Sequence, residues 1–102
     1  MPLFIKTERF TAEAVKLSKE KRQQYINEHC SWVAKLNKSG VKVCSGYLAN
    51  EKGVAGGGGM LVIEAKSFVE AQSFVKKDPM IISNLVHWNI QEWIPVVGIL
   101  MN

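Results

Sequence analysis

The 102-residue sequence lacks the features that indicate disulfide bonds, a structural metal site or a membrane-spanning segment. It has only two cysteines, Cys30 and Cys44, without CxxC spacing or a neighbouring histidine pair, which argues against a disulfide framework or a zinc ribbon. The longest apolar stretch, IPVVGILM, is far shorter than the ~20 residues of a membrane span. HxH and HExxH patterns and acidic clusters are missing too. We therefore expect no membrane insertion, no metal site and no cofactor.

The sequence also lacks a concentrated charge of one sign. The net charge is +4, and the basic residues of KLSKEKRQQ are mixed with an acid, which is typical of a solvated helix face. No pattern of interleaved basic and aromatic residues accompanies them, so we expect no nucleic-acid partner. The opening MPLFIKTER reaches charged residues sooner than a signal peptide would. These features predict reduced thiols and a cytoplasmic location.

The composition is that of an ordinary globular domain. Hydrophobic residues make up 47% of the chain and charged residues 22%. A chain of this length forms one domain, here residues 1–102, and buries roughly two-thirds of its unfolded surface.

Periodicity and capping residues predict two helices and four strands. Thr11 and Ser18 are potential helix caps, and an unbroken helix of residues 12–39 would measure ~42 Å, so we expect a break near Leu17 or Ser18. Ser67 begins the second helix, with Glu70 completing a capping box, and Asp78-Pro79 ends it. The predicted strands are residues 2–8, 41–48, 59–66 and 86–96. The order β-α-β-β-α-β predicts a ferredoxin-like α+β fold with a four-stranded antiparallel sheet.

Both faces of this sheet should be apolar. Leu61 and Ile63 point to one face, and Met60 and Val62 point to the other. Since helices cover only one face, the second face is expected to pack against another copy of the chain, forming a homodimer. The apolar tail of residues 96–102 would fit the same interface, or it would pack on its own chain.

The glycine run Gly56–Gly59 invites comparison with a phosphate-binding loop. No GK[ST] sequence follows it, and it leads into a strand rather than a helix. We interpret the run as a flexible hairpin loop, whose amides could bind a carboxylate.

A histidine interrupts the apolar stripe of the first helix. Ile26, His29, Val33 and Leu36 share one helix face by their three- and four-residue spacing. Since both helices of the predicted fold cover the same sheet face, His29 could reach Asp78 at the end of the second helix. An aspartate bonded to one ring nitrogen would leave the other free to act as base or acid. The alternative is a structural hydrogen bond, and no serine or cysteine is clearly placed as a nucleophile.

Several motifs resemble those of the YCII-related family, a branch of the dimeric α+β barrel superfamily. Arg22 and His29 match its R-x6-H helix, Gly40 and Gly46 bracket its second strand, and residues 58–78 follow its "G…V…A.S…A……DP" course. The resemblance implies a His29–Asp78 dyad in a small enzyme. One relative eliminates chloride from a chlorinated hydroxyhydroquinone, and a peroxidase-like role is suggested for others.

The sequence departs from the family pattern at four positions. Tyr47 replaces a proline, Met80 an aromatic residue, Asn84 a glycine, and Ile26 a basic residue. These departures do not change the expected fold, but they mean that the substrate of other family members cannot be assigned to this chain.

Two functions from different classes follow. The first is a small cytoplasmic enzyme of lyase or elimination type that acts on a small organic molecule, with His29 shuttling a proton and Asp78 orienting it. The second is a non-catalytic dimeric module that binds a small ligand or a partner, with a structural His29–Asp78 pair. The residues expected to line the pocket are Arg22, Ser45, Tyr47, Gly58 and Trp88, although sheet packing explains Ser45, Tyr47 and Trp88 equally well.

Overall fold

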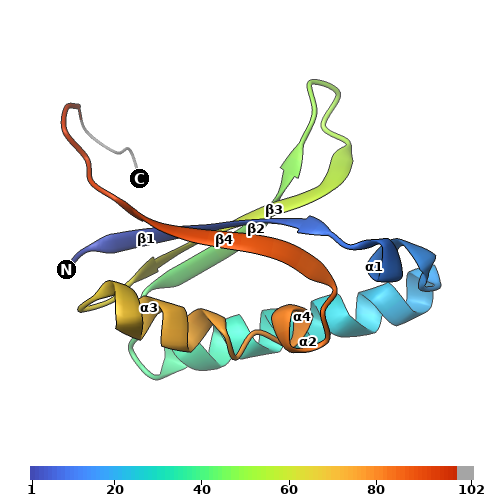
Figure 1. The fold of residues 1–102 in the computed structure, drawn as a ribbon, viewed down its shortest axis with the longest axis horizontal. Coiled ribbons are helices and arrows are strands. Elements are labelled where there is room, and N and C mark those ends of the chain that lie inside the picture. The colour runs from blue at the N-terminus through green and yellow to red at the C-terminus, as the bar shows by residue number, and fades with distance from the viewer. Residues whose placement is uncertain (99–102) are drawn as a thin grey trace.

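A computed structural model describes residues 1–98 and shows the ferredoxin-like arrangement in two layers (Figure 1). The four strands form one antiparallel sheet in the order β2-β3-β1-β4, and the helices all lie on one side of it. The elements in chain order are β1 (Leu3–Phe10), α1 (Ala12–Lys16), α2 (Lys19–Lys38), β2 (Val43–Ala49), β3 (Ala55–Glu64), α3 (Phe68–Val75), α4 (Pro79–Ile82) and β4 (Val86–Trp93).

The first three helices begin at the predicted residues, each with a side chain that caps its N-terminus. The Oγ1 of Thr11 accepts a hydrogen bond from the Ala14 amide, and the Oγ of Ser18 accepts one from the Lys21 amide. Leu17 is extended, so the expected break between the first two helical segments is present. The Ser67 side chain caps α3 as predicted, whereas the Glu70 carboxylate accepts from the Lys66 amide rather than from that of Ser67.

The core lies between the sheet and the helices. Its fully buried side chains include Phe4 from β1, Leu61 and Ile63 from β3, and Val75 from α3. Partly buried residues of α2, such as Val33, pack against this cluster. The core therefore fixes α2 and the end of α3 on the same sheet face.

The interpretation of Gly56–Gly59 as a loop was wrong, because the run forms part of β3. Gly58 and Gly59 pair with Arg9 and Glu8 of β1, and the hairpin turn lies earlier, where the Asn50 side chain accepts from the Lys52 and Val54 amides. The reason is close packing: a Cβ on Gly59 would lie 3.0 Å from the carbonyl oxygen of Gly46. A Cβ on Gly58 would likewise lie 3.3 Å from the carbonyl oxygen of Glu8, so Gly58 and Gly59 permit close approach of the neighbouring strands.

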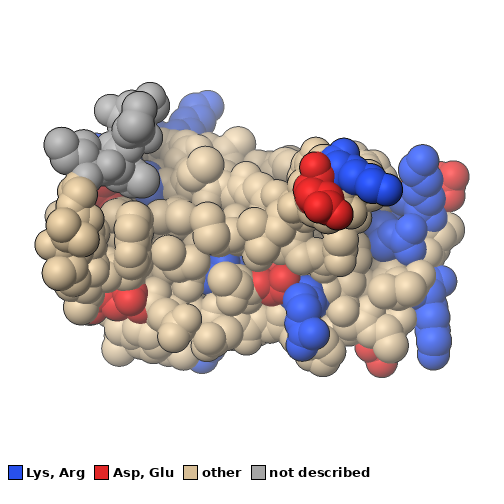
Figure 2. Space-filling view, turned by 90° about the horizontal axis from the view of Figure 1, so that it is seen from above, with Lys and Arg blue, Asp and Glu red and all other residues tan. Residues whose placement is uncertain are grey.

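The outer face of the sheet carries apolar side chains, as predicted. Met60 is 39% exposed there, and Figure 2 shows large uncharged areas on this side of the molecule. Of the tail of residues 96–102, expected at a dimer interface, residues 99–102 fall outside the described part, while Val96 and Val97 are exposed.

Candidate active site

Asp78 is held at the start of α4 by the local sequence. Its Oδ1 accepts a hydrogen bond of 2.9 Å from the Met80 amide, and Pro79 occupies the first helical position, where no amide hydrogen is needed. The whole residue is buried. The same Asp-Pro step that ends the preceding helical segment therefore points a carboxylate into the molecule.

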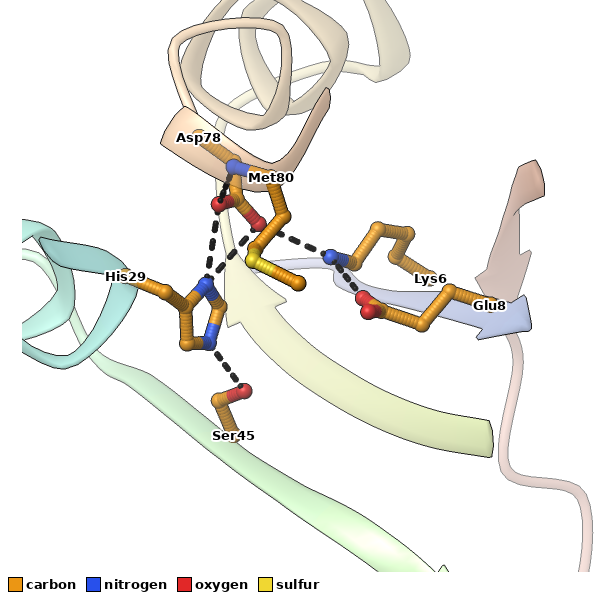
Figure 3. A network of polar contacts seen from close by, with 6 residues as sticks. All are labelled: Lys6, Glu8, His29, Ser45, Asp78 and Met80. Atoms are coloured by element: carbon orange, nitrogen blue, oxygen red, sulfur yellow. Dashed lines mark hydrogen bonds and ion pairs between the residues drawn. The ribbon is translucent and has the colours of Figure 1, made fainter. Parts of the chain in front are cut away.

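The imidazole of His29 meets this carboxylate. Its Nδ1 lies 2.9 Å from each of the two Asp78 oxygens, and its side chain keeps 14% of its surface exposed (Figure 3). The contact that we expected across 49 positions is thus present. The imidazole bridges α2 and α4 while remaining open to solvent on one side.

The other ring nitrogen also has a partner. The Nε2 of His29 lies 2.8 Å from the Oγ of Ser45, which comes from β2. Three side chains from three separate elements therefore form a line from Asp78 through His29 to Ser45.

Electrostatics fix the proton positions in this line. Burial raises the pKa of Asp78, but the hydrogen bond from His29, the charges of Lys6 and His29 and the Met80 amide together outweigh it, so the pKa is lowered. Asp78 is thus an anion at neutral pH and can only accept hydrogen bonds. In the neutral ring Nδ1 must carry the hydrogen, Nε2 accepts, and the Ser45 hydroxyl donates to it.

Two residues of the network were missed from the sequence. The Nζ of Lys6, which is fully buried, lies 3.1 Å from the Oδ2 of Asp78 and also pairs with the Glu8 carboxylate. A signal was present, because Phe4, Lys6, Glu8 and Phe10 share one face of β1 by their two-residue spacing. A lysine and a glutamate between two inward-facing aromatic residues indicate a buried ion pair.

A cavity of about 470 Å³ opens beside the imidazole. Its volume falls in the range typical of small-molecule sites. Apolar walls come from Phe10, Ile26, Val33 and Met80, while His29, Ser45 and Glu8 supply polar groups. Cys30, Gly46, Tyr47, Gly58 and Gly59 complete the lining. The site therefore combines a titratable ring with a largely apolar hollow.

Comparison with known proteins identifies the family. The sequence profile of the YCII-related domain matches residues 4–94. The chain belongs to the YCII-related family. No functionally curated protein is similar enough to count as a relative.

The solved structures that share the fold of this YCII-related chain include the following two. One is 5-chloro-2-hydroxyhydroquinone dehydrochlorinase from Burkholderia phenoliruptrix, in complex with 2,5-dihydroxybenzoquinone, with a TM-score of 0.64 and 21% sequence identity over 89% of this chain and 92% of that one. The other is a dimeric ferredoxin-like protein from an uncultured marine organism, with a TM-score of 0.51 and 13% identity over 97% of this chain and all of that one. At these identities the likeness concerns the fold.

The YCII-related structure brings three of the five expected pocket residues to the cavity. Ser45, Tyr47 and Gly58 line it. Arg22 does not, because its guanidinium donates to the carbonyl oxygens of Val15 and Leu17 at 3.0 and 2.7 Å. Trp88 is also outside the lining, since it packs against the core.

Neither a metal cluster nor a membrane segment is seen within residues 1–98. No three His, Cys, Asp or Glu side chains of this part gather as ligands for an ion. None of its helices combines the length and the apolar character needed to cross a bilayer.

Proposed function

We propose that this YCII-related protein is a small-molecule enzyme of lyase type, in which His29 moves a proton and Asp78 holds its ring. The observation that carries the proposal is the position of His29, between a buried carboxylate and an accessible cavity. A polar pair needed for folding alone does not require an adjoining hollow. A titratable ring that lines a cavity and contacts a buried carboxylate with a lowered pKa favours a functional site.

An elimination would use the pair as follows. The Nε2 of His29 accepts a proton from a substrate hydroxyl, and the O–H electron pair forms a C=O bond. The neighbouring C=C bond shifts by one position, and the leaving group departs with its own bonding pair from the next carbon, which is saturated in the keto tautomer of the substrate. Asp78, already an anion, stabilises the imidazolium that forms. For Nε2 to meet the substrate, the Ser45 hydroxyl must rotate away from it.

The cavity favours a small, mainly apolar and uncharged substrate. Its walls are aromatic and aliphatic, and the Glu8 carboxylate in the lining disfavours an anion. A hydroxylated aromatic ring fits this description. The dehydrochlorinase with the same fold, solved with 2,5-dihydroxybenzoquinone, supports the choice of halogenated hydroxyquinols as first candidates.

Chloride release from 5-chloro-2-hydroxyhydroquinone, followed by ion chromatography, tests the proposal. His29→Gln should reduce the rate by about 10²–10⁴-fold, the usual contribution of a general base. His87→Gln is the matched control, because His87 is an exposed residue of β4. Equal rates in the His29→Gln variant and the wild type would refute the role of His29. If the wild type releases halide neither from this compound nor from other halogenated hydroxyquinols, the proposed substrate class is contradicted.

The second candidate is a binding module in which the pair is structural. It is favoured by the complete pairing of the network, since within residues 1–98 every buried side-chain nitrogen or oxygen has a hydrogen-bond partner. Such a module would bind hydroxylated aromatic compounds without converting them. Detectable binding of a compound that is afterwards recovered chemically unchanged would identify this function.

We infer that the uncovered sheet face packs against a second copy. The support is its apolar character, with Ile5, Met60 and Val62 on the side opposite the helices. The dimeric ferredoxin-like protein of the same fold adds to this support.

A further inference from the structure

Ser45 occupies the position of a nucleophile relative to His29 and Asp78. Its Oγ lies 2.8 Å from Nε2 of His29, whose Nδ1 lies 2.9 Å from the Asp78 carboxylate. Figure 3 shows the three side chains in sequence, with Ser45 on β2, His29 on α2 and Asp78 at α4. The arrangement of acid, base and hydroxyl is recognised by its geometry and does not depend on a particular fold or residue order.

The proton positions make the hydroxyl the donor. Because Asp78 accepts from Nδ1, the remaining lone pair of the neutral ring is at Nε2, and the Ser45 hydroxyl is directed at it. A hydroxyl that donates to a base can lose its proton as it attacks, which is how weak oxygen nucleophiles are activated. The elimination described above uses the ring and leaves this hydroxyl without a role.

The surroundings of Ser45 are open to a reactant. Ser45 lines the same cavity as His29, together with Gly46 of its own strand and Gly58 and Gly59 of β3. These three residues have no side chains beyond hydrogen. A flat acyl group can therefore approach β2 more closely than it could at a strand of larger residues.

We propose that Ser45 is an acyl-accepting nucleophile and that the protein has a second activity, the hydrolysis of small uncharged aryl esters. In the first step a bond forms between Oγ and the carbonyl carbon, the ester C–O bond breaks, and the Oγ proton passes through Nε2 to the departing phenolate oxygen. In the second step water attacks the acyl carbon, the Oγ–carbon bond breaks, and the water proton returns through Nε2 to Oγ.

The apolar walls define the ester class. Phe10, Ile26 and Val33 would contact an aromatic leaving group, and the carboxylate of Glu8 disfavours an acid-bearing ester. An acetyl ester of a neutral or weakly acidic phenol satisfies both conditions. This second activity shares His29 and Asp78 with the proposed elimination but depends separately on Ser45.

Hydrolysis of p-nitrophenyl acetate tests the inference. The wild type should show a burst of p-nitrophenolate and a gain of one acetyl group, which peptide mass spectrometry should locate at Ser45. The Ser45→Ala variant should show no burst and should hydrolyse the ester about 10²–10⁴-fold more slowly than the wild type. The Ser73→Ala variant, changed at an exposed serine of α3, should show the burst and the hydrolysis rate of the wild type. Ser45→Cys, which keeps a nucleophile at the position, should be acetylated at position 45.

The two activities can fail separately. If the wild type releases no chloride but becomes acetylated at Ser45, only the proposed elimination is contradicted. An acetyl group found at Cys30 or on lysines instead of Ser45, or a Ser45→Ala variant that hydrolyses the ester at the wild-type rate, would overturn the role of Ser45. Nuclear magnetic resonance (NMR) spectra of each variant would establish that it folds, and if Ser45→Ala does not, the acetylation site in the wild type and in Ser45→Cys decides the question.

Discussion

The Nδ1 of His29 lies 2.9 Å from both carboxylate oxygens of Asp78, although 49 positions separate the two residues. One partner comes from the middle of α2 and the other begins α4. Their contact ties two helical elements together next to a cavity. The contact is therefore expected to affect both the stability of the fold and the proposed proton transfer, and separate experiments can measure the two effects.

Asp78→Asn should destabilise the protein by about 1–3 kcal/mol at neutral pH, because it disturbs a buried, fully bonded carboxylate. Since the pKa of Asp78 is lower in the folded protein than its ordinary value of 3.8, the charged form favours folding. The stabilisation is complete above pH 3.8 and is lost as the pH falls through the folded pKa. Urea unfolding of both proteins should show a difference that shrinks at acidic pH.

Glu28→Gln is the control for this substitution, because Glu28 is an exposed acid next to His29. It should leave the free energy of unfolding nearly unchanged. A difference between wild type and Asp78→Asn that stays constant down to pH 2 would contradict the assignment.

Lys6→Met should raise the pKa of Asp78, since the positive charge of Lys6 is one of the causes that lower it. The sequence contains one aspartate, so selective ¹³C labelling of aspartate gives a single side-chain carboxyl signal to titrate. The same substitution should cost about 3–5 kcal/mol, because it leaves the buried carboxylate of Asp78 without the cation of Lys6. Lys66→Met, at an exposed position, should change neither quantity.

Gly59→Ala should destabilise the sheet by about 1–3 kcal/mol, because the added Cβ would lie 3.0 Å from the Gly46 carbonyl oxygen. Gly46→Ala is the matched control, since its Cβ meets no atom within 4 Å. Thermal unfolding compares them. Equal losses in the two variants would mean that crowding is not the reason for glycine at position 59.

Met60→Lys should yield a monomer, because it places a charge on the uncovered sheet face. Val69→Lys, which changes an exposed apolar residue of α3, should leave the assembly intact. Light scattering during size-exclusion chromatography measures the masses. A wild-type protein that is monomeric throughout the accessible concentration range would contradict the proposed dimer.

Local signals were sufficient for much of the fold. Thr11, Ser18 and Ser67 marked helix starts because their capping bonds are made within a few residues. The proximity of His29 and Asp78 followed from topology, since helices of this fold share one sheet face.

Contacts set by three-dimensional packing were harder to predict. The two-residue spacing of Lys6 and Glu8 with Phe4 and Phe10 places both charges on the inner face of β1, but the partner that lets Lys6 be buried, Asp78, lies 72 positions away in the sequence. The glycine run resembles a loop because the strand neighbours that require it, such as Gly46, are distant in sequence. Whether Ser45 reaches Nε2 depends on how α2 lies across β2, which no local pattern specifies.

Histidine ring NMR tests the central claim most directly, because the sequence has only two histidines, His29 and His87. With ¹⁵N-labelled histidine and added 2,5-dihydroxybenzoquinone, the His29 ring signals should shift in a saturable way while those of exposed His87 stay in place. At a pH where the ring is neutral, His29 should carry its hydrogen on Nδ1. A hydrogen on Nε2, or a His29 ring that does not respond to this or to other hydroxylated aromatics, would contradict the account.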